Sequence, residues 1–264
     1  MSAERAALYA RLPVTAADRW WLELARRAEG PVLDLGAGPG RLTGALAQTG
    51  TAVVAVEREP AMLAELEPRI ARLREVDGAD VELVRADVVD LPDGPPAGLV
   101  VLATSLLNEL ADPAARRAAL AGAARRCRAD GLVALHLLAP DWLLDPPASG
   151  VGRLRPLEGG SDVEVELVAG GLDRWAARRH ARLTYRFADG TIAVDELDAA
   201  VVTGAELDDA LATAGLVRVT GPAPADDVAA AEGLTRVAAV PPPAGASAWY
   251  VLARPVAGQG DGPG

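Results

Sequence analysis

The 264-residue sequence predicts an α/β fold: a mostly parallel sheet with helices on both faces, and an antiparallel β-meander inserted into it. Three observations support this prediction. Short buried strands alternate with helical segments through the first half of the chain. The first strand leads directly into a glycine-rich loop at residues 34–40. After residue 140 the alternation gives way to longer strand-like runs joined by a hairpin turn.

The parallel part begins after a helix at residues 15–29, which Thr15 can cap and which Gly30 and Pro31 end. Apolar runs that are short and bounded by turn residues indicate buried parallel strands. Such strands are expected at residues 32–35, 52–56, 81–85, 98–103 and 132–138. Helices are expected between them at residues 41–48, 60–74 and 112–127.

The meander follows residues 145–160, which are rich in Pro and Gly and predict a loop. Its strands are expected at residues 163–169, 174–187 and 191–202. The turn Ala188-Asp189-Gly190 joins the last two.

A capping-box pair, Thr203 and Glu206, then begins another helix, and two strands close the fold at residues 216–220 and 249–254. The predicted organisation is a core, an insert that is a substrate platform or a dimer contact, and a disordered tail. These three parts comprise residues 1–147 with 203–255, residues 148–202, and residues 256–264.

The net charge of −11 argues against nucleic acid as a partner, because phosphate binding needs a basic surface. All 26 basic residues are Arg, which indicates coding bias rather than function. The densest Arg cluster is predicted to lie on the solvated face of a helix. It comprises Arg116, Arg117, Arg125, Arg126 and Arg128.

Cys127 is the sole cysteine, which excludes a disulfide within the chain, and with two His residues a zinc site is not expected. The N-terminal residues lack a signal-peptide pattern. No apolar stretch approaches the ~20 residues needed to cross a bilayer. We therefore expect a cytoplasmic protein with no membrane partner.

The glycine loop, Asp-Leu-Gly-Ala-Gly-Pro-Gly, lies between a predicted strand and a predicted helix, where backbone N–H groups can face a ligand. A dinucleotide fingerprint needs a third glycine at position 41, where this chain has Arg41. The observed spacing is G-x-G-x-G, with Asp34 two residues before Gly36. A dinucleotide is therefore the poorer match.

Asp34, Gly36, Gly38 and Gly40 match the first motif of the class I S-adenosylmethionine-dependent methyltransferases, which this sequence resembles along nearly its whole length. The resemblance implies a Rossmann-like seven-stranded sheet with an antiparallel last strand, and S-adenosylmethionine as cofactor. It implies that the glycine loop, with Ala37, holds the methionine part, that Glu57 binds the ribose and that Asp87 and Val88 contact adenine. The other implied cofactor residues are Arg58, Met62, Ala103, Ser105 and, folding over the cofactor from the N-terminus, Tyr9.

The predicted catalytic residues are His136 and Asp141, near the end of the fifth strand. His136 can be a base or an acceptor-binding group, or a satisfied histidine in an apolar strand. Asn108 and Glu109 follow the fourth strand and are similarly placed. The family's Asn-Pro-Pro-Tyr type motif is missing from residues 103–108, which argues against nucleobase amines.

Aromatic residues near the insert admit two interpretations: they cover an apolar or cationic acceptor, or they attach the meander to the core. They are Trp142, Trp175 and Tyr185.

The predicted function is methyl transfer to N or O of a small molecule, a specialised metabolite, by a chain that can form a homodimer. An alternative is an enzyme of the same fold that keeps the cofactor but catalyses another reaction, such as cyclisation or decarboxylation. A third is a non-catalytic subunit, which the intact glycine loop disfavours.

Overall fold

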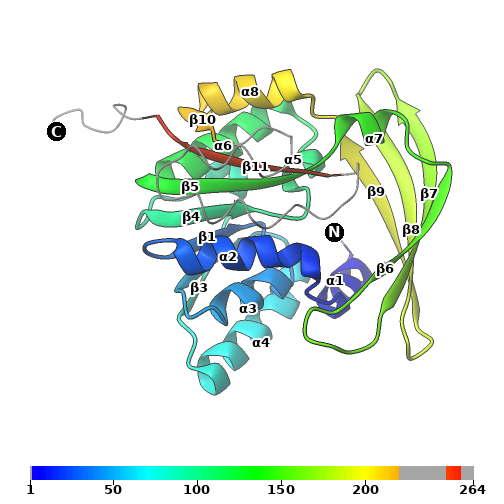
Figure 1. The fold of residues 1–264 in the computed structure, drawn as a ribbon, viewed down its shortest axis with the longest axis horizontal. Helices are drawn as coiled ribbons and strands as arrows, with labels where there is room; N and C mark the ends of the chain where they lie inside the picture. The colour runs from blue at the N-terminus through cyan, green and yellow to red at the C-terminus, as the bar shows by residue number, and fades with distance from the viewer. Residues whose placement is uncertain (1, 220–247, 257–264) are drawn as a thin grey trace.

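The computed structural model describes residues 2–219 and 248–256. Within these residues, one sheet has seven strands in the order β10-β11-β5-β4-β1-β2-β3 (Figure 1). The strands are β1 (Val32–Leu35), β2 (Val53–Glu57), β3 (Val81–Arg85), β4 (Ala97–Leu102), β5 (Cys127–Leu138), β10 (Leu216–Arg218) and β11 (Ala248–Pro255). Each of these seven strands lies at a position along the chain where the sequence predicted one.

The helices of the described residues include three that the sequence did not predict, namely the first, fifth and seventh. They are α1 (Ala3–Arg11), α2 (Arg19–Arg27), α3 (Arg41–Ala47), α4 (Pro60–Asp77), α5 (Leu106–Glu109), α6 (Pro113–Arg126), α7 (Pro140–Leu144) and α8 (Gly204–Thr213). Two short 3₁₀ helices are η1 (Ala16–Asp18) and η2 (Val88–Asp90). The predicted helix at residues 15–29 is thus η1 followed by α2.

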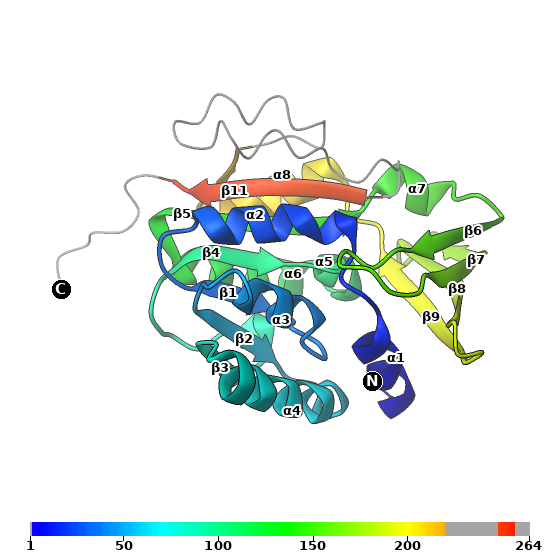
Figure 2. The ribbon, with the colours of Figure 1, turned by 60° about the horizontal axis from the view of Figure 1, so that its bottom comes forward.

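The parallel strands β1, β2 and β4 are buried on both faces because helices cover each face of the sheet (Figure 2). Side chains alternate along β1, so Val32 packs on the side of α2, α3 and α4, and Leu33 packs on the side of α6 and α8. β11 runs antiparallel to β5, with Tyr250 opposite His136. The prediction of an antiparallel last strand is confirmed.

A second sheet lies beyond the carboxyl ends of the parallel strands (Figure 1). In the fully described segment 149–200, it has four antiparallel strands: β6 (Ser149–Leu154), β7 (Val163–Asp173), β8 (Arg178–Arg186) and β9 (Ile192–Ala200). The sequence predicted three, because Gly150 and Gly152 made β6 look like a loop. β6 is an edge strand whose backbone pairs with β7.

Helix α1 connects the two sheets: it packs on α4 of the core and on β9. Its buried Leu8 lies in a small apolar cluster with Val163 and Tyr185 of the second sheet. Tyr185 therefore attaches this sheet to the rest of the protein, as one of its two interpretations proposed. The same interpretation is wrong for Trp175, whose surface is fully exposed.

The predicted solvated Arg face is also partly wrong. Arg116 and Arg126 are buried. Arg126 donates to the carbonyl oxygens of Pro92 and Pro95, and Arg116 pairs with Glu206 of α8. The guanidinium groups of Arg116 and Arg126 are buried and occupied by acceptors within the chain, so they form no basic surface.

In the described part of the chain, no helix is long and apolar enough to cross a membrane. The predicted disordered tail lies, apart from Val256, outside the described residues.

Candidate active site

A cavity of about 460 Å³ opens at the carboxyl ends of β1, β2, β4 and β5. Open α/β sheets place their ligands at this edge. One side of the cavity is lined by the glycine loop and by the ends of β2 and β3. The side nearer the second sheet is lined by Arg5, Glu109, Leu110, Leu154 and Tyr185, and we call it the sheet side.

The glycine loop needs glycine for two different reasons. Gly36, Gly38 and Gly40 all have positive φ angles, +71°, +57° and +81°, which other residues rarely adopt. Gly36 and Gly38 line the cavity together with Ala37 and Asp34. Gly40 is the N-cap of α3, and a Cβ there would lie 2.5 Å from Cδ1 of Leu66, so its role is close packing against α4.

Asp34 lies at the end of β1 and is 2% exposed. Its Oδ2 accepts a hydrogen bond from the Thr43 hydroxyl at 2.7 Å. Burial raises the pKa of the Asp34 carboxyl to about 6, against the opposing effect of that hydrogen bond. The fold thus keeps a buried carboxylate beside the cavity at a cost in free energy.

Glu57, at the end of β2, is held by backbone N–H groups on both sides. Its Oε2 accepts from Gly38 at 2.8 Å, and its Oε1 accepts from Arg58 and Glu59 at 2.8 Å each. A carboxylate has about four acceptor positions, so one remains for a ligand donor. The three bonds fix the orientation of the side chain.

Asp87 lines the cavity beyond β3 and caps η2 by accepting from Val89 at 3.0 Å. Its other oxygen is paired with the half-exposed guanidinium of Arg58. Met62 and Val88 are buried and line the same part of the cavity. The structure therefore brings together the residues predicted to hold the ribose and adenine.

The end of β4 carries Ala103 and Thr104 on the cavity wall. Thr104 and Ser105 have positive φ angles of 55° and 61° without being glycine, a strained conformation that concentrates at functional sites. The Ser105 N–H donates to Nδ1 of His136 at 3.0 Å. His136 thus holds this turn.

His136 lines the cavity, but its geometry does not suit a general base. Burial lowers the pKa of the imidazole to about 4, so the ring is neutral near pH 7. Since Nδ1 accepts from Ser105, the proton lies on Nε2. The lone pair of Nδ1, which a base would need free, already accepts the hydrogen bond from Ser105.

The other predicted catalytic residue, Asp141, is exposed on α7 and is not among the described residues that line the cavity. Asn108 is fully buried; its Nδ2 donates to the carbonyl of Ala200, and its Oδ1 accepts from Leu138 N–H, each at 2.9 Å. It ties the ends of β5 and β9 together.

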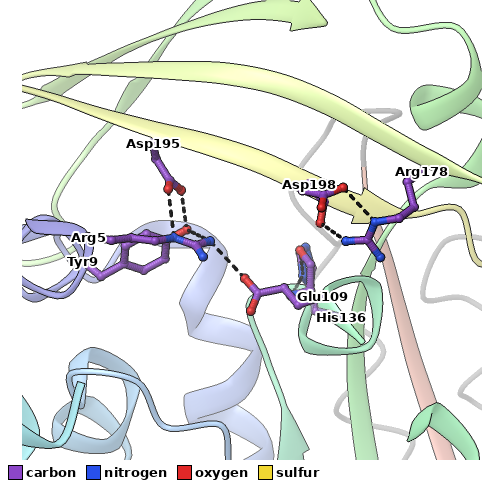
Figure 3. Close-up of polar contacts among 8 residues, drawn as sticks. Arg5, Tyr9, Glu109, His136, Arg178, Asp195 and Asp198 are labelled. Carbon is purple, nitrogen blue, oxygen red and sulfur yellow. Dashed lines mark hydrogen bonds and ion pairs between the residues drawn. The ribbon is translucent and has the colours of Figure 1, made fainter. Parts of the chain in front are cut away.

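Figure 3 shows a polar cluster on the sheet side. The sequence predicted Tyr9 and Glu109 as site residues, but not their partners Arg5 and Asp195. Arg5 of α1 lies between Asp195 of β9, at 2.8 Å, and Glu109 of α5, at 3.2 Å. The Tyr9 hydroxyl donates to Asp195 at 2.9 Å, and Tyr9 lines the cavity from α1, which precedes η1 and α2. These contacts join segments up to 190 positions apart, so no local pattern indicates them.

A second pair that the sequence did not reveal also lines the cavity. Arg41 donates to both oxygens of Asp18, at 2.6 and 3.2 Å. Tyr250 and Trp21 line the same cavity, and the Tyr250 ring packs against the rings of both His136 and Trp21. Arg41, which occupies the position where a dinucleotide fingerprint needs glycine, therefore lines the cavity.

These residues fit the cofactor that the sequence implies. The volume lies within the ~300–1,000 Å³ of small-molecule sites. Asp34 and Glu57 suit a sulfonium cation and a ribose diol, and Met62 and Val88 present apolar surface to a base. Among the described residues, no group of three or more His, Cys, Asp or Glu side chains could hold a metal ion.

Comparison with known proteins supports the same assignment. Residues 32–131 match the family model described as a methyltransferase domain. No curated protein sequence matches the chain.

Among solved structures, the CcbJ methyltransferase from Streptomyces caelestis is 22% identical, with a TM-score of 0.64 over 91% of this chain and 94% of that one. The sugar N-methyltransferase KedS8 from Streptoalloteichus is 18% identical, with a TM-score of 0.63 over 91% and 87%. CalS10, an amino pentose methyltransferase from Micromonospora echinaspora involved in calicheamicin biosynthesis, is 21% identical, with a TM-score of 0.62 over 96% and 97%.

The matched segment contains the glycine loop and the ends of β2, β3 and β4, which line one side of the cavity. The whole fold agrees with that of the solved methyltransferases. Residues 32–131 thus carry a methyltransferase domain, and the chain has the fold of solved methyltransferases.

Proposed function

We propose that this enzyme methylates an amine nitrogen of a small molecule of specialised metabolism. The observation that supports this is one continuous cavity with two kinds of wall. The glycine loop, Glu57 and Asp87 form the cofactor wall. The sheet side has apolar surface from Leu154 and Tyr185 together with the carboxylate of Glu109.

When bound, S-adenosylmethionine supplies a methyl group already activated by a positive sulfur. The protein's task is then to orient the acceptor and to exclude water. Leu106, Leu110, Leu154 and Tyr185 line the cavity and keep the acceptor side apolar. Asp34 and Glu57 provide negative charge for a cationic cofactor.

The charges around the cavity favour an amine over a hydroxyl acceptor. Of the described lining residues, six carry carboxylates and three carry guanidinium groups: Asp18, Asp34, Glu57, Glu59, Asp87 and Glu109, against Arg5, Arg41 and Arg58. The surplus of negative charge attracts cations. His136, the base that a hydroxyl acceptor would use, is neutral and occupied.

Two proteins of similar structure support this choice, since KedS8 is a sugar N-methyltransferase and CalS10 is an amino pentose methyltransferase. We propose that residues 148–202 form the acceptor platform of this enzyme, because Leu154 and Tyr185 of that segment line the cavity.

The outer face of the same segment exposes Val151, Ile192 and Val194, and we propose a homodimer contact there. Sedimentation would test that contact.

The test is a labelled-methyl assay with pairs of acceptors that differ in one group, amino sugars and their hydroxyl counterparts. We expect label in the amino compounds and release of S-adenosylhomocysteine. Label in the hydroxyl compounds alone would contradict N-methylation. Conversion of an acceptor with S-adenosylmethionine recovered unchanged would support the alternative of a non-transfer reaction.

A further inference from the structure

The carboxylate of Glu109 is partly open to the cavity, and Arg5 holds it from one side. The side chain is 38% exposed, and it lines the cavity from α5 (Figure 3). Burial raises the pKa of the Glu109 carboxyl, and Arg5 opposes that rise. A carboxylate in this setting is stabilised by any cation that approaches it.

On its other side, Arg5 has a second and shorter ion pair. Asp195, whose side chain is 3% exposed, contacts Nε of Arg5 at 2.8 Å. Glu109 contacts Nη2 of the same guanidinium at 3.2 Å. Arg5 can therefore lose Glu109 and keep a charged partner, because Asp195 remains beside it.

We propose that Glu109 binds the ammonium group of the acceptor, and that Arg5 is the internal cation which the acceptor displaces from it. Asp195 is a positioning residue, because it keeps the Arg5 charge paired after the exchange. This inference rests on the proposed amine acceptor and names the residue that recognises it.

The same carboxylate is placed to free the nitrogen lone pair. One N–H bond of the ammonium breaks and one O–H bond forms on Glu109, which leaves a neutral amine and a neutral carboxyl group. No electrons are exchanged, and no further reactant is needed. The charged groups that influence the proton on Glu109 are Arg5 on α1, Asp195 on β9 and Glu57 on β2. The other titratable groups on nearby elements that line the cavity are Tyr9 on α1, Tyr185 on β8 and His136 on β5.

The exchange can be tested by binding alone. The enzyme is first saturated with S-adenosylhomocysteine and then titrated by NMR with cyclohexylammonium chloride or with cyclohexanol, which differ in charge but little in size. We expect wild type to bind the ammonium about tenfold more tightly than the alcohol, because one charge-assisted hydrogen bond distinguishes them.

Glu109→Gln should abolish this preference and leave the affinity for S-adenosylhomocysteine unchanged. Glu196→Gln is the matched control, because Glu196 is exposed on β9 and pairs with Arg182. Arg5→Gln should act in the opposite direction and tighten ammonium binding several-fold, because it removes the internal competitor. This second variant keeps the test decisive if Glu109→Gln fails to fold.

Retained preference in Glu109→Gln, no preference in wild type, or weaker ammonium binding in Arg5→Gln would each overturn the inference. Failure of wild type to bind S-adenosylhomocysteine is a different result, and it would count against the proposed function.

Discussion

Replacing Asp34 with Asn should stabilise the folded protein at neutral pH and weaken cofactor binding. Burial raises the pKa of the Asp34 carboxyl from 3.8 to about 6. A carboxyl with a raised pKa contributes stability below its unfolded pKa, and this contribution is lost as the pH rises through its folded pKa. The cost of Asp34 to the free energy of unfolding thus grows from about pH 3.8 and is complete above about pH 6.

The size of this cost follows from the shift. About two pKa units at ~1.4 kcal/mol each correspond to about 3 kcal/mol at pH 8. At pH 4.5 the Asp34 carboxyl is largely protonated in the folded protein and partly protonated in the unfolded chain, so the cost is about 1 kcal/mol. An Asn amide oxygen can still accept the hydrogen bond from the Thr43 hydroxyl, so little else is lost.

Urea unfolding at pH 4.5 and pH 8 would measure this difference. Asp34→Asn should exceed wild type in the free energy of unfolding by about 1 and about 3 kcal/mol respectively. Glu75→Gln, an exposed carboxylate of α4, is the control and should show no such change with pH. Equal or lower stability of Asp34→Asn at pH 8 would refute the reasoning. Calorimetry should show weaker binding of S-adenosylmethionine to Asp34→Asn, because the cavity loses a negative charge.

Three further predictions follow from single contacts. Gly40→Ala should lower the free energy of unfolding by about 3 kcal/mol, and Gly50→Ala by about 1 kcal/mol. Both glycines have positive φ, but an added Cβ would clash with Leu66 at position 40 and would have nothing within 4 Å at position 50. Equal losses in thermal unfolding would contradict this. NMR titration should find the pKa of the His136 imidazole near 4. Because the unfolded chain then takes up this proton more readily, the free energy of unfolding should fall as the pH falls below 6.5. An ordinary pKa would exclude the buried neutral ring. Asn108→Ala should cost about 3 kcal/mol in urea unfolding, because two buried backbone groups lose their partner, and a loss under about 1 would show that these bonds are not needed.

The parallel core was predictable because its signals are local. Each buried strand is a short apolar run, and Glu57 and Asp87 follow such runs directly. The carboxyl ends of parallel strands meet at one edge, so residues after different strands share a cavity. The resemblance to class I methyltransferases implied that Glu57, Asp87 and the glycine loop share one site, and this geometric rule agrees with that expectation.

The sheet side of the cavity was not predictable in this way. Arg5, Glu109 and Asp195 come from α1, α5 and β9, and nothing in their local sequence shows that they meet. The burial of Arg126 depends on carbonyl oxygens of a distant loop, which a residue pattern does not display. Sequence thus indicated the donor site and left the acceptor site to tertiary structure.

The most direct test of the account is calorimetry of S-adenosylhomocysteine binding to wild type and to Glu57→Gln, with Glu75→Gln as the control. Glu57 accepts three backbone N–H bonds from the two loops that form the cofactor wall, and an amide NH₂ cannot replace a carboxylate oxygen there. We predict one site per chain in wild type and in the control, and loss of binding in Glu57→Gln with its circular dichroism spectrum retained. Absence of binding in folded wild type, or equal binding in Glu57→Gln, would contradict the account.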